Sequence, residues 1–284
     1  MDSNVVTEAV ADFQQFVGLE STGLMDEATH EMMTKPRCGM KDRHDFDEEY
    51  SRSKRYTTLD GVWGNYNLTY MIQMYPDLPT SAVDEEVERA AAVWAAVTKF
   101  RFRPATNNEL ADIRITFASR DHGDGMPFDG RGMVVAHAFP PPSGKLHFDI
   151  AEEWTIRCYE GQNLFHTAVH EFGHILGLGH SDILASVMFP YAKGYNPNFT
   201  LHEDDIKGIQ VLYGVKEYSC SDAPNDHVGA VCQKGMDKPF TDIKDKKYWQ
   251  LSVLGQLVHI NFANLGKINN FSIEDFCLLG CCAV

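Results

Sequence analysis

The stretch HEFGHILGLGH, from His170 to His180, constrains this chain more than any other. His170 and His174 are four residues apart, so on a helix they lie on one face and their imidazoles can reach the same metal ion. The glycines that follow are expected to end that helix and let His180 turn back as a third ligand. Three neutral imidazoles leave one tetrahedral position of Zn²⁺ open, which is typical of a catalytic site. Glu171 follows the first ligand and can reach that open position.

Two histidines at helical spacing would, on their own, indicate only a polar helix face. The adjacent glutamate, the glycine three residues after the second histidine and the third histidine argue against that simple interpretation. Met188 in ASVMFP, eight residues past His180, adds the methionine turn that accompanies such sites. A lone methionine is more often core filler, so Met188 counts only through its position.

Composition narrows the possible classes of protein. A chain of 284 residues with 44% hydrophobic content is long enough for one sizeable domain and smaller parts. The net charge of −15, from 40 acidic and 25 basic residues, argues against a nucleic-acid surface. No apolar run approaches the roughly 20 residues needed to span a bilayer. The first residues, MDSNVVTEAV, lack the basic region and apolar core of a signal peptide.

Helical and extended patterns follow one another along the chain, which predicts a mixed fold of helices on a sheet. Two short helices joined by Ser-Thr-Gly are expected at residues 5–17 and from Asp26 onward. Strands are expected at residues 67–75, 100–104 and 111–118. A long amphipathic helix is expected to start near Ser81. Its buried face should carry Val87, Ala91, Trp94 and Val97.

The segment from residue 122 to 154 combines glycines and prolines with many metal-ligating side chains. Singly, each would be an ordinary surface residue, but their grouping favours metal sites. A closed, structural zinc site would use His122, Asp124, His137 and His147. A hard cation such as Ca²⁺ would suit Asp129, Asp149 and Glu152, beside glycines with accessible carbonyls.

The N-terminal part contains two further signals. Cys38 lies in PRCGMKD, an expected Pro/Gly turn, beside Arg37. A free cysteine is usually a small buried hydrophobe, but a neighbouring cation favours the thiolate, which binds zinc. The basic cluster from Arg52 to Arg55 lies between a helical segment and a zinc domain. It is interpreted as a proprotein convertase cleavage site.

Together these residues make the chain resemble a matrix metalloproteinase, a matrixin of the metzincin clan. The similarity covers roughly residues 5–214 and rests on PRCG, HGDxxPFDG, AHAF, HFD, HEFGHxLGLGHS, the methionine turn and DDIxGIQxLYG. It implies a secreted zinc endopeptidase, made as a zymogen, that cuts extracellular-matrix or other extracellular proteins. The implied fold is α+β, a twisted, mostly parallel five-stranded sheet with three helices, preceded by a small helical propeptide. The expected domains are residues 1–55, 56–214 and a Cys-rich tail at 215–284.

The resemblance implies a role for each candidate residue. Glu171 would be the general base, taking a proton from a zinc-bound water and delivering it to the leaving amine. The catalytic zinc ligands would be His170, His174 and His180, and the structural zinc ligands His122, Asp124, His137 and His147. The calcium ligands would be Asp129, Asp149, Glu152 and the carbonyls of Gly130, Gly132 and Val134. Two zinc ions and Ca²⁺ are therefore expected.

Regulation follows from the same resemblance. Cys38 would be a cysteine switch whose thiolate fills the open zinc position. Cleavage after Arg55 by a furin-like convertase would remove it and leave Tyr56 as the new N-terminus. The new ammonium is expected to pair with Asp204 or Asp205. Endogenous metalloproteinase inhibitors are further implied partners.

Several positions depart from the family pattern. Lys41 replaces a usual proline of the switch, which predicts weaker latency. His166 occupies the position that sets the depth of the S1′ pocket, and predicts either an intermediate, pH-sensitive pocket or a histidine that points to solvent. The wall of the S1′ pocket has the sequence Pro190, Tyr191, Ala192, which departs from the family pattern. The shape of the pocket is therefore not inferred from the family. The short loop PPPSG lacks an aspartate, which argues against a further calcium site with Asp112.

The resemblance is expected to end at Gly214, leaving too few residues for a hemopexin-like propeller. The tail, with five of the seven cysteines and the β-like run YWQLSVLGQLVHINF, indicates either a disulfide-stapled module or a fragment of a larger β domain. With Cys38 on zinc, the other six cysteines can form three disulfides, one of them using Cys158. Glycosylation sequons, used only in the secretory pathway, occur at Asn67, Asn198 and Asn270.

Two other functions compete with a secreted protease. A non-catalytic extracellular binding protein on the same scaffold is the first alternative, and the presence of Glu171 argues against it. A cytosolic metalloprotease would explain the missing signal peptide, but it fits poorly with the Cys-rich tail and the convertase site. We therefore expect a secreted chain whose signal and first propeptide helix precede the sequence given.

Overall fold

The computed structural model describes residues 3–42, 58–59, 61–106, 110–216, 248–253 and 256–261. It divides into two compact units, residues 1–216 and 217–284. The convertase cluster with Arg55, the new N-terminus Tyr56, the tail cysteines and Asn270 all lie outside the described residues.

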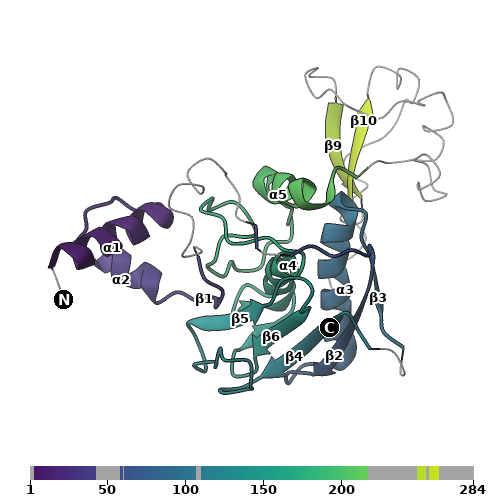
Figure 1. Ribbon diagram of the computed structural model, residues 1–284, viewed down its shortest axis with the longest axis horizontal. Coiled ribbons are helices and arrows are strands. Elements are labelled where there is room, and N and C mark those ends of the chain that lie inside the picture. Colours follow the sequence, from purple (N-terminus) through teal and green to yellow (C-terminus); the bar gives the residue numbers. More distant parts are fainter. Residues whose placement is uncertain are drawn as a thin grey trace. The chain divides into compact units, whose positions relative to one another are not determined.

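The first unit is built on a mixed sheet of six strands. These are β1 (Arg37–Cys38), β2 (Asn67–Met74), β3 (Arg101–Pro104), β4 (Ile113–Ala118), β5 (Val134–Ala138) and β6 (Lys145–Asp149). The spatial order is β1-β5-β6-β4-β2-β3, and only the β5–β6 pair is antiparallel (Figure 1). The expectation of a mostly parallel sheet is confirmed. The expected count of five was one short, because the N-terminal segment adds β1 to the open backbone edge of β5.

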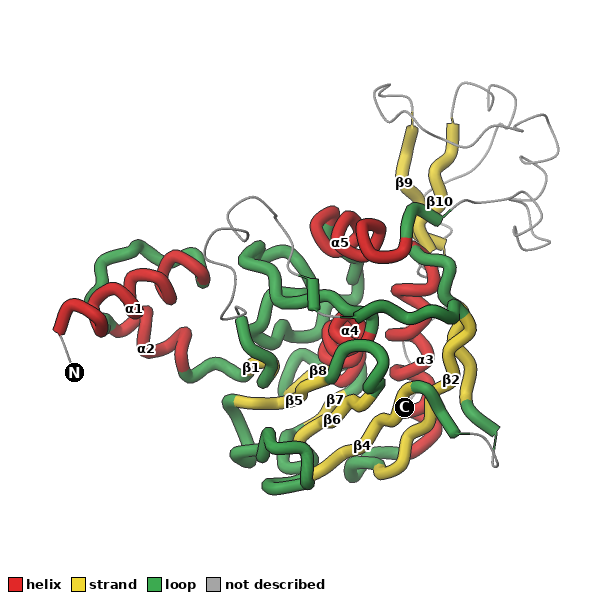
Figure 2. The backbone as a smooth tube through the Cα atoms, in the orientation of Figure 1, coloured by secondary structure: helices red, strands yellow, loops and turns green. Residues whose placement is uncertain are grey.

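Two helices cover one face of this sheet. They are α3 (Thr80–Val97) and α4 (Leu164–Ile175), which pack against each other (Figures 1 and 2). The succession β2, α3, β3 is a parallel βαβ unit, since the two strands pair in parallel and the helix connects them. The predicted buried face of α3 is confirmed, but the helix starts at Thr80 after Pro79 and has no side-chain cap.

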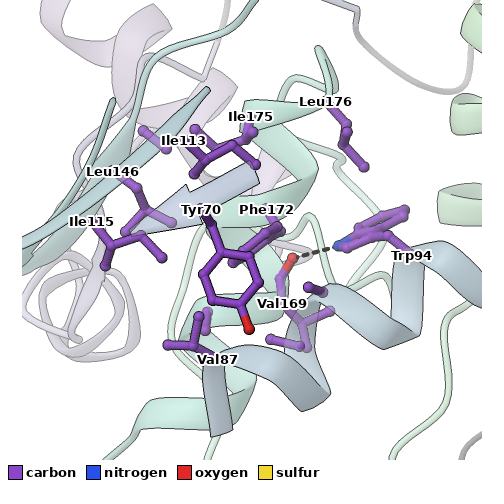
Figure 3. Packing of buried hydrophobic residues seen from close by; sticks show 14 of the residues in the cluster. Tyr70, Val87, Trp94, Ile113, Ile115, Leu146, Val169, Phe172, Ile175 and Leu176 are labelled. Carbon is purple, nitrogen blue, oxygen red and sulfur yellow. Dashed lines mark hydrogen bonds between the residues drawn. The ribbon is translucent and has the colours of Figure 1, made fainter. Parts of the chain in front are cut away.

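The core forms where strand and helix side chains meet. Ile113 and Ile115 of β4 point toward Phe172 of α4 in Figure 3, which also shows Trp94 of α3 beside Val169. The indole Nε1 of Trp94 donates a hydrogen bond of 2.8 Å to the carbonyl of Val169. This bond satisfies the buried polar atom of the tryptophan and links α3 to α4.

Strand alternation places two histidines on the face of the sheet opposite the helices. His137 of β5 lies directly across from His147 of β6 in the antiparallel register. Their neighbours Leu146 and Phe148 belong to the core, so the intervening His147 must point the other way. The pairing register therefore brings the two imidazoles together without a contribution from loops.

The N-terminal segment folds into two helices, α1 (Ser3–Phe16) and α2 (Glu27–Met33), as predicted. The buried amide of Gln14 joins them, because its Nε2 donates to the carbonyl of Leu24 and the hydroxyl of Thr29 while its Oε1 accepts from the N–H of Gly23. A small apolar cluster lies at the end of α1. Its buried members are Val17, Phe189 and Tyr191.

The described residues also include two strand pairs and one helix that are not part of the main sheet. β7 (Trp154–Thr155) and β8 (Gln162–Asn163) form a short parallel pair, and α5 (Glu203–Tyr213) begins with a capping box formed by His202. In the second unit, β9 (Tyr248–Val253) and β10 (Gln256–Asn261) pair antiparallel within the run expected to be β. None of the helices in the described ranges is long and apolar enough to cross a membrane.

Gly173 offers a test of the packing around α4. A Cβ added there would lie 2.3 Å from Sδ of Met188 and 3.1 Å from the Trp94 ring. We expect Gly173→Ala to lower the free energy of unfolding by about 1–3 kcal/mol through overpacking, measured by denaturant titration. Gly194→Ala is the matched control, because nothing lies within 4 Å of the added atom. Equal stability of the two variants would contradict the close packing of Met188 on α4.

Candidate active site and metal centres

The helix that carries the first two histidines is buried along its whole length and is fixed at both ends. The side chain of Asn163 caps its start by accepting from the N–H of His166 at 2.9 Å. The helix ends at Ile175, and Gly177 follows with a left-handed φ of 95°. A glycine is suited to this conformation because it has no Cβ. The prediction that glycine ends the helix is thus confirmed at Gly177.

Three imidazoles converge beside this helix with their Nδ1 atoms already engaged. Nδ1 of His170 lies 2.7 Å from the carbonyl of Val187, and Nδ1 of His174 lies 2.7 Å from that of Leu178. A carbonyl only accepts, so each Nδ1 carries the proton and Nε2 is left for a metal. The two Nε2 atoms are 3.1 Å apart.

The third imidazole is oriented by the N-terminal segment. Nδ1 of His180 lies 2.8 Å from Oδ1 of Asp42, which also binds the guanidinium of Arg37. Nε2 of His180 is buried and has no hydrogen-bond partner in the described part of the chain. A buried nitrogen without a partner fits a metal ligand, since an unpaired polar atom in the interior is otherwise costly. Burial lowers the pKa of all three histidines and keeps them in the neutral, metal-binding form.

Cys38 completes this cluster. Its Sγ lies 3.4 Å from Nε2 of His174, and the ligand atoms of the four residues all lie within 4.8 Å of one another. The expected turn at Cys38 is instead extended strand. The N–H of Cys38 donates to the carbonyl of Pro190, and the N–H of Gly39 donates to that of Ala136 on the opposite side. The segment is therefore held between β5 and residues 190–192.

Arg37 was expected to favour the thiolate form of Cys38, but burial outweighs this effect. Burial raises the pKa of the Cys38 thiol well above its ordinary value, the carboxylate of Glu171 raises it further, and Arg37 lowers it only slightly. The guanidinium is occupied by Asp42, whose pKa falls to about 2 because hydrogen bonds from His180 and Arg37 outweigh its burial. A thiolate at this position therefore requires a metal ion rather than a neighbouring cation.

Glu171 lies beside the imidazoles and is completely buried. Neither of its carboxylate oxygens has a hydrogen-bond partner of normal geometry among the residues that the structure describes, although the thiol of Cys38 lies near enough to lower its pKa slightly against the effect of burial. Burial raises its pKa to about 8. Its position next to a pocket and a three-histidine cluster is that of a group able to exchange a proton with a bound molecule.

The pocket beside Glu171 is lined by His166 and by the predicted wall residues Pro190 and Tyr191. His166 is only 8% exposed, so the alternative of a histidine that points to solvent was wrong. The Phe199 ring packs against it at 5.2 Å and 90° between the ring planes. Burial, with a smaller contribution from Lys193, lowers the pKa of His166 to about 4. The imidazole is therefore neutral at physiological pH.

The second cluster has a closed geometry. Oδ2 of Asp124 lies 2.7–2.9 Å from the nearest nitrogens of His122, His137 and His147. Nε2 of His137 is 3.4 Å from Nε2 of His122 and 3.3 Å from Nδ1 of His147. A tetrahedron with metal–nitrogen bonds of about 2.0–2.1 Å has edges of about 3.3 Å. The two nitrogen–nitrogen distances match such an edge, whereas the oxygen of Asp124 lies closer to the nitrogens than it would around a zinc ion. The set supplies four ligand atoms for a closed tetrahedral site.

The calcium candidates come from two segments that contact each other, residues 129–134 and residues 149–152. The N–H of Gly130 donates to Asp149 and the N–H of Gly132 donates to Glu152. Burial raises the pKa of Glu152, and the carboxylates of Asp149 and Asp129 raise it further against the effect of that N–H. A cation would relieve the repulsion among these three acids. The structure gives no contacts for the carbonyl of Val134, whose N–H instead faces Asp129.

Sequence reasoning missed how the methionine turn is held. The carboxylate of Asp205, in the first turn of α5, accepts from the N–H groups of Val187 and Met188 and from the hydroxyl of Ser186. Its neighbour Asp204 accepts from the hydroxyl of Ser181. The motif DDIxGIQxLYG contains Asp205, but nothing in the sequence indicated that this carboxylate binds the methionine turn. The same applies to Asp42, whose contact with His180 the sequence did not indicate.

Asp112 is engaged elsewhere. Its Oδ2 accepts from both the N–H and the hydroxyl of Thr69 at 2.8 and 2.7 Å. Cys158 carries a free and exposed thiol.

Comparison with known proteins identifies the fold that holds these sites. The matrixin family model matches residues 62–214, more than half of the chain. The chain belongs to the matrixin family. Residues 2–33 of this matrixin also match the family model of a peptidoglycan-binding domain.

Individual relatives agree with this assignment. The matrixin is 45% identical to the hatching enzyme of Paracentrotus lividus over 73% of its own length and 34% of the relative. It is 46% identical to the macrophage metalloelastase of Oryctolagus cuniculus over 75% of its length and 45% of the relative. It is 37% identical to the neutrophil collagenase of Homo sapiens over 93% of its length and 57% of the relative. The chain thus spans between about a third and somewhat over half of these relatives.

The similarity to neutrophil collagenase corrects one expectation. An alignment that covers 93% of a chain of 284 residues passes residue 214 wherever it begins. The expectation that the resemblance ends at Gly214 was therefore wrong. The short strands and scattered cysteines of the tail form too weak a sequence pattern to show the resemblance beyond residue 214.

The two clusters predict a metal stoichiometry. Elemental analysis of the folded chain should give about two zinc ions per molecule, one for each tetrahedral set. Asp124→Ala should remove one of them, because Asp124 contacts every other member of the closed cluster. Asp121→Ala, an exposed aspartate of the same loop, is the control and should retain both. A single zinc ion in the unsubstituted chain would refute the closed site.

Proposed function

We propose that this matrixin is the zymogen of a secreted zinc endopeptidase that cleaves extracellular-matrix or other extracellular proteins. The observation that carries the proposal is the convergence of three Nε2 atoms beside a buried carboxylate without hydrogen bonds. These atoms belong to His170, His174 and His180, and the carboxylate is that of Glu171. A small pocket lined by Cys38, His166 and Tyr191 adjoins this carboxylate.

The chemistry divides between the metal and the protein. Zinc held by the three imidazoles would act as a Lewis acid toward a water molecule and the scissile carbonyl. Glu171 accepts a proton from the attacking water and then delivers it to the leaving amine, so no covalent intermediate with the protein is needed. The side chain after the scissile bond enters the S1′ pocket between His166 and Tyr191. The carbonyls of Val187 and Leu178 keep two imidazoles in the required tautomer.

Latency is proposed to come from the N-terminal segment. Cys38 takes the fourth ligand position, where its backbone is held by β5 on one side and by Pro190 on the other. Cleavage after Arg55 by a furin-like convertase removes the segment. The new ammonium of Tyr56 is assigned to Asp204, because four donors already occupy Asp205.

Further partners are proposals of the same kind. The closed cluster would hold a structural zinc ion, and Asp129, Asp149 and Glu152 would hold Ca²⁺. Endogenous metalloproteinase inhibitors bind at the cleft. The tail is part of a β-rich region, in keeping with the hairpin β9–β10 and with the similarity to neutrophil collagenase beyond residue 214.

Replacing Glu171 tests the catalytic role. Glu171→Ala should retain two zinc ions but lower kcat on peptide substrates by about 10²–10⁴-fold, because proton transfer loses its base. The processed full chain is assayed on a peptide library with and without a zinc chelator. Glu153→Ala, an exposed glutamate, is the control. Retained turnover in Glu171→Ala, or turnover unaffected by chelation, would contradict the mechanism. A chain that binds extracellular proteins without turnover would favour a binding role instead.

Replacing Cys38 tests latency. In an Arg55→Ala background that prevents processing, Cys38→Ser should raise peptide hydrolysis by the uncut chain severalfold, because a hydroxyl is a weaker zinc ligand than a thiolate. Activity should stay below that of the processed enzyme, since the backbone bonds of β1 remain. Cys158→Ser in the same background controls for loss of a thiol. Unchanged latency in Cys38→Ser would show that Cys38 does not hold the zymogen silent.

A further inference from the structure

The face of the sheet opposite the helices carries a band of basic side chains. Strand alternation places four cations there, because the residues beside each of them belong to the core or pack against it. The strands β3, β2, β4 and β6 are consecutive in the sheet (Figure 1). With about 4.8 Å between neighbouring strands, the band is about 14 Å wide. Its members are Arg101 and Arg103 of β3, Arg114 of β4 and Lys145 of β6.

Two of these cations lie directly side by side. Arg114 is opposite Lys145 in the parallel register of β4 and β6, and like charges in opposite positions destabilise a sheet. The guanidinium of Arg114 donates to the carbonyl of Ser143 at 3.0 Å, but neither cation forms an ion pair with any described residue. The side chain of Arg101 is exposed and makes no hydrogen bond or ion pair in the described ranges. The carboxylates of the described chain therefore leave the charge of these three cations uncompensated.

Acidic side chains are scarce around the band, although the chain has a net charge of −15. The strands β2, β3 and β4 contain no acidic residue. Asp112, just before β4, already accepts from the N–H and the hydroxyl of Thr69. Exposed cations elsewhere are paired, since Lys35 and Lys207 each bind a glutamate one helical turn away. The band is thus a local reversal of the charge of the molecule.

Protection of a sheet edge explains only part of the band. β3 is the last strand of the sheet, where charged residues and a proline, such as Arg103 and Pro104, hinder pairing with another chain. β4 and β6 are interior strands with both edges paired, so Arg114 and Lys145 have no such role. An anionic partner would offset the repulsion between these two neighbours.

We propose that this basic band is a binding surface for a sulfated polysaccharide of the extracellular matrix, and that it tethers the enzyme to the matrix at a place apart from the zinc cluster. The extracellular setting rests on the proposed function, whereas the binding itself needs no catalysis.

The chemistry of the band favours a linear polyanion. Cations spread over four strands contact several charges of one polymer at once, and a guanidinium binds tetrahedral oxyanions through paired N–H donors. Membrane attachment would in addition bury apolar side chains in the lipid. Of the large apolar side chains on these four strands, those that are exposed are Met71 and Met74 of β2. The band therefore offers charge without the aromatic or leucine side chains that a lipid surface would need.

Heparin, a sulfated polysaccharide, is the probe for this surface. Binding of the uncleaved full chain to immobilised heparin is measured over a series of salt concentrations. Hyaluronan, which is unsulfated, and vesicles that contain phosphatidylserine are measured in parallel. The chain should bind heparin despite its net negative charge and bind hyaluronan about tenfold more weakly, and the affinity for heparin should fall as salt rises.

Two double variants with the same change in charge locate the binding. Arg101→Gln with Lys145→Gln should weaken heparin binding about tenfold, because each exposed ion pair that is lost costs about threefold. Hydrolysis of a small peptide by this variant after processing should be unchanged, since both side chains are exposed. Lys35→Gln with Lys207→Gln is the matched control and should bind heparin as the unsubstituted chain does, because these cations lie outside the band.

The results that would overturn the proposal are distinct. They are the absence of heparin binding at physiological salt, equal binding of hyaluronan, and equal losses in the two double variants. Unchanged binding in Arg101→Gln with Lys145→Gln would overturn it as well and would assign heparin to the basic clusters at residues 52–55 or 244–247. Vesicle binding that depends on the same two residues, without heparin binding, would indicate a lipid partner instead. None of these measurements requires turnover, so failure of the proposed peptidase is detected separately in the peptide assay.

Discussion

The burial of α4 between the sheet and the methionine turn is the constraint on which both the fold and the site depend. A helix buried along its length cannot rely on solvent to orient its histidines, so neighbouring carbonyls do so. Val187 and Leu178 each bind one Nδ1, and both come from the chain just beyond the helix. Gly173 lets the sulfur of Met188 approach the helix closely. Packing and hydrogen bonds to backbone carbonyls therefore position the imidazoles without a metal ion.

Strand β5, which lies between β1 and β6, contributes to both clusters of candidate metal ligands by different means. Its side chains alternate, so His137 reaches the closed cluster on one face while Ala136 and Ala138 pack in the core. Its free backbone edge pairs with Cys38, which reaches the three-histidine cluster. One strand thus presents a histidine to the closed cluster through its side-chain alternation and binds the Cys38 segment through its backbone edge. A peptide substrate would compete for that same edge, because both are extended chains that need backbone partners.

What the sequence predicted depended on local spacing. The pair His170 and His174 follows from helical periodicity, and the amphipathic face of α3 follows from its apolar pattern. The hydrogen-bond partner of His180 could not be predicted in this way, because Asp42 is 138 residues away in sequence. The extended form of Cys38 was hidden for the same reason, because a strand of two residues exists only through its pairing with β5. Burial also made one prediction from neighbouring residues wrong. Desolvation raises the pKa of the Cys38 thiol by more than the adjacent Arg37 lowers it.

The proposed latency would be distributed over several contacts. The thiol of Cys38 lies beside the three imidazoles, backbone bonds hold the segment on both sides, and Val17 packs on Phe189 and Tyr191. The apolar cluster and the backbone bonds act whether or not the sulfur binds zinc. Because the contacts share one short segment, ordering by one lowers the entropic cost of the others. Under the proposed activation, cleavage after Arg55 would remove that advantage for all of these contacts at once, whereas loss of a single contact would leave the others in place.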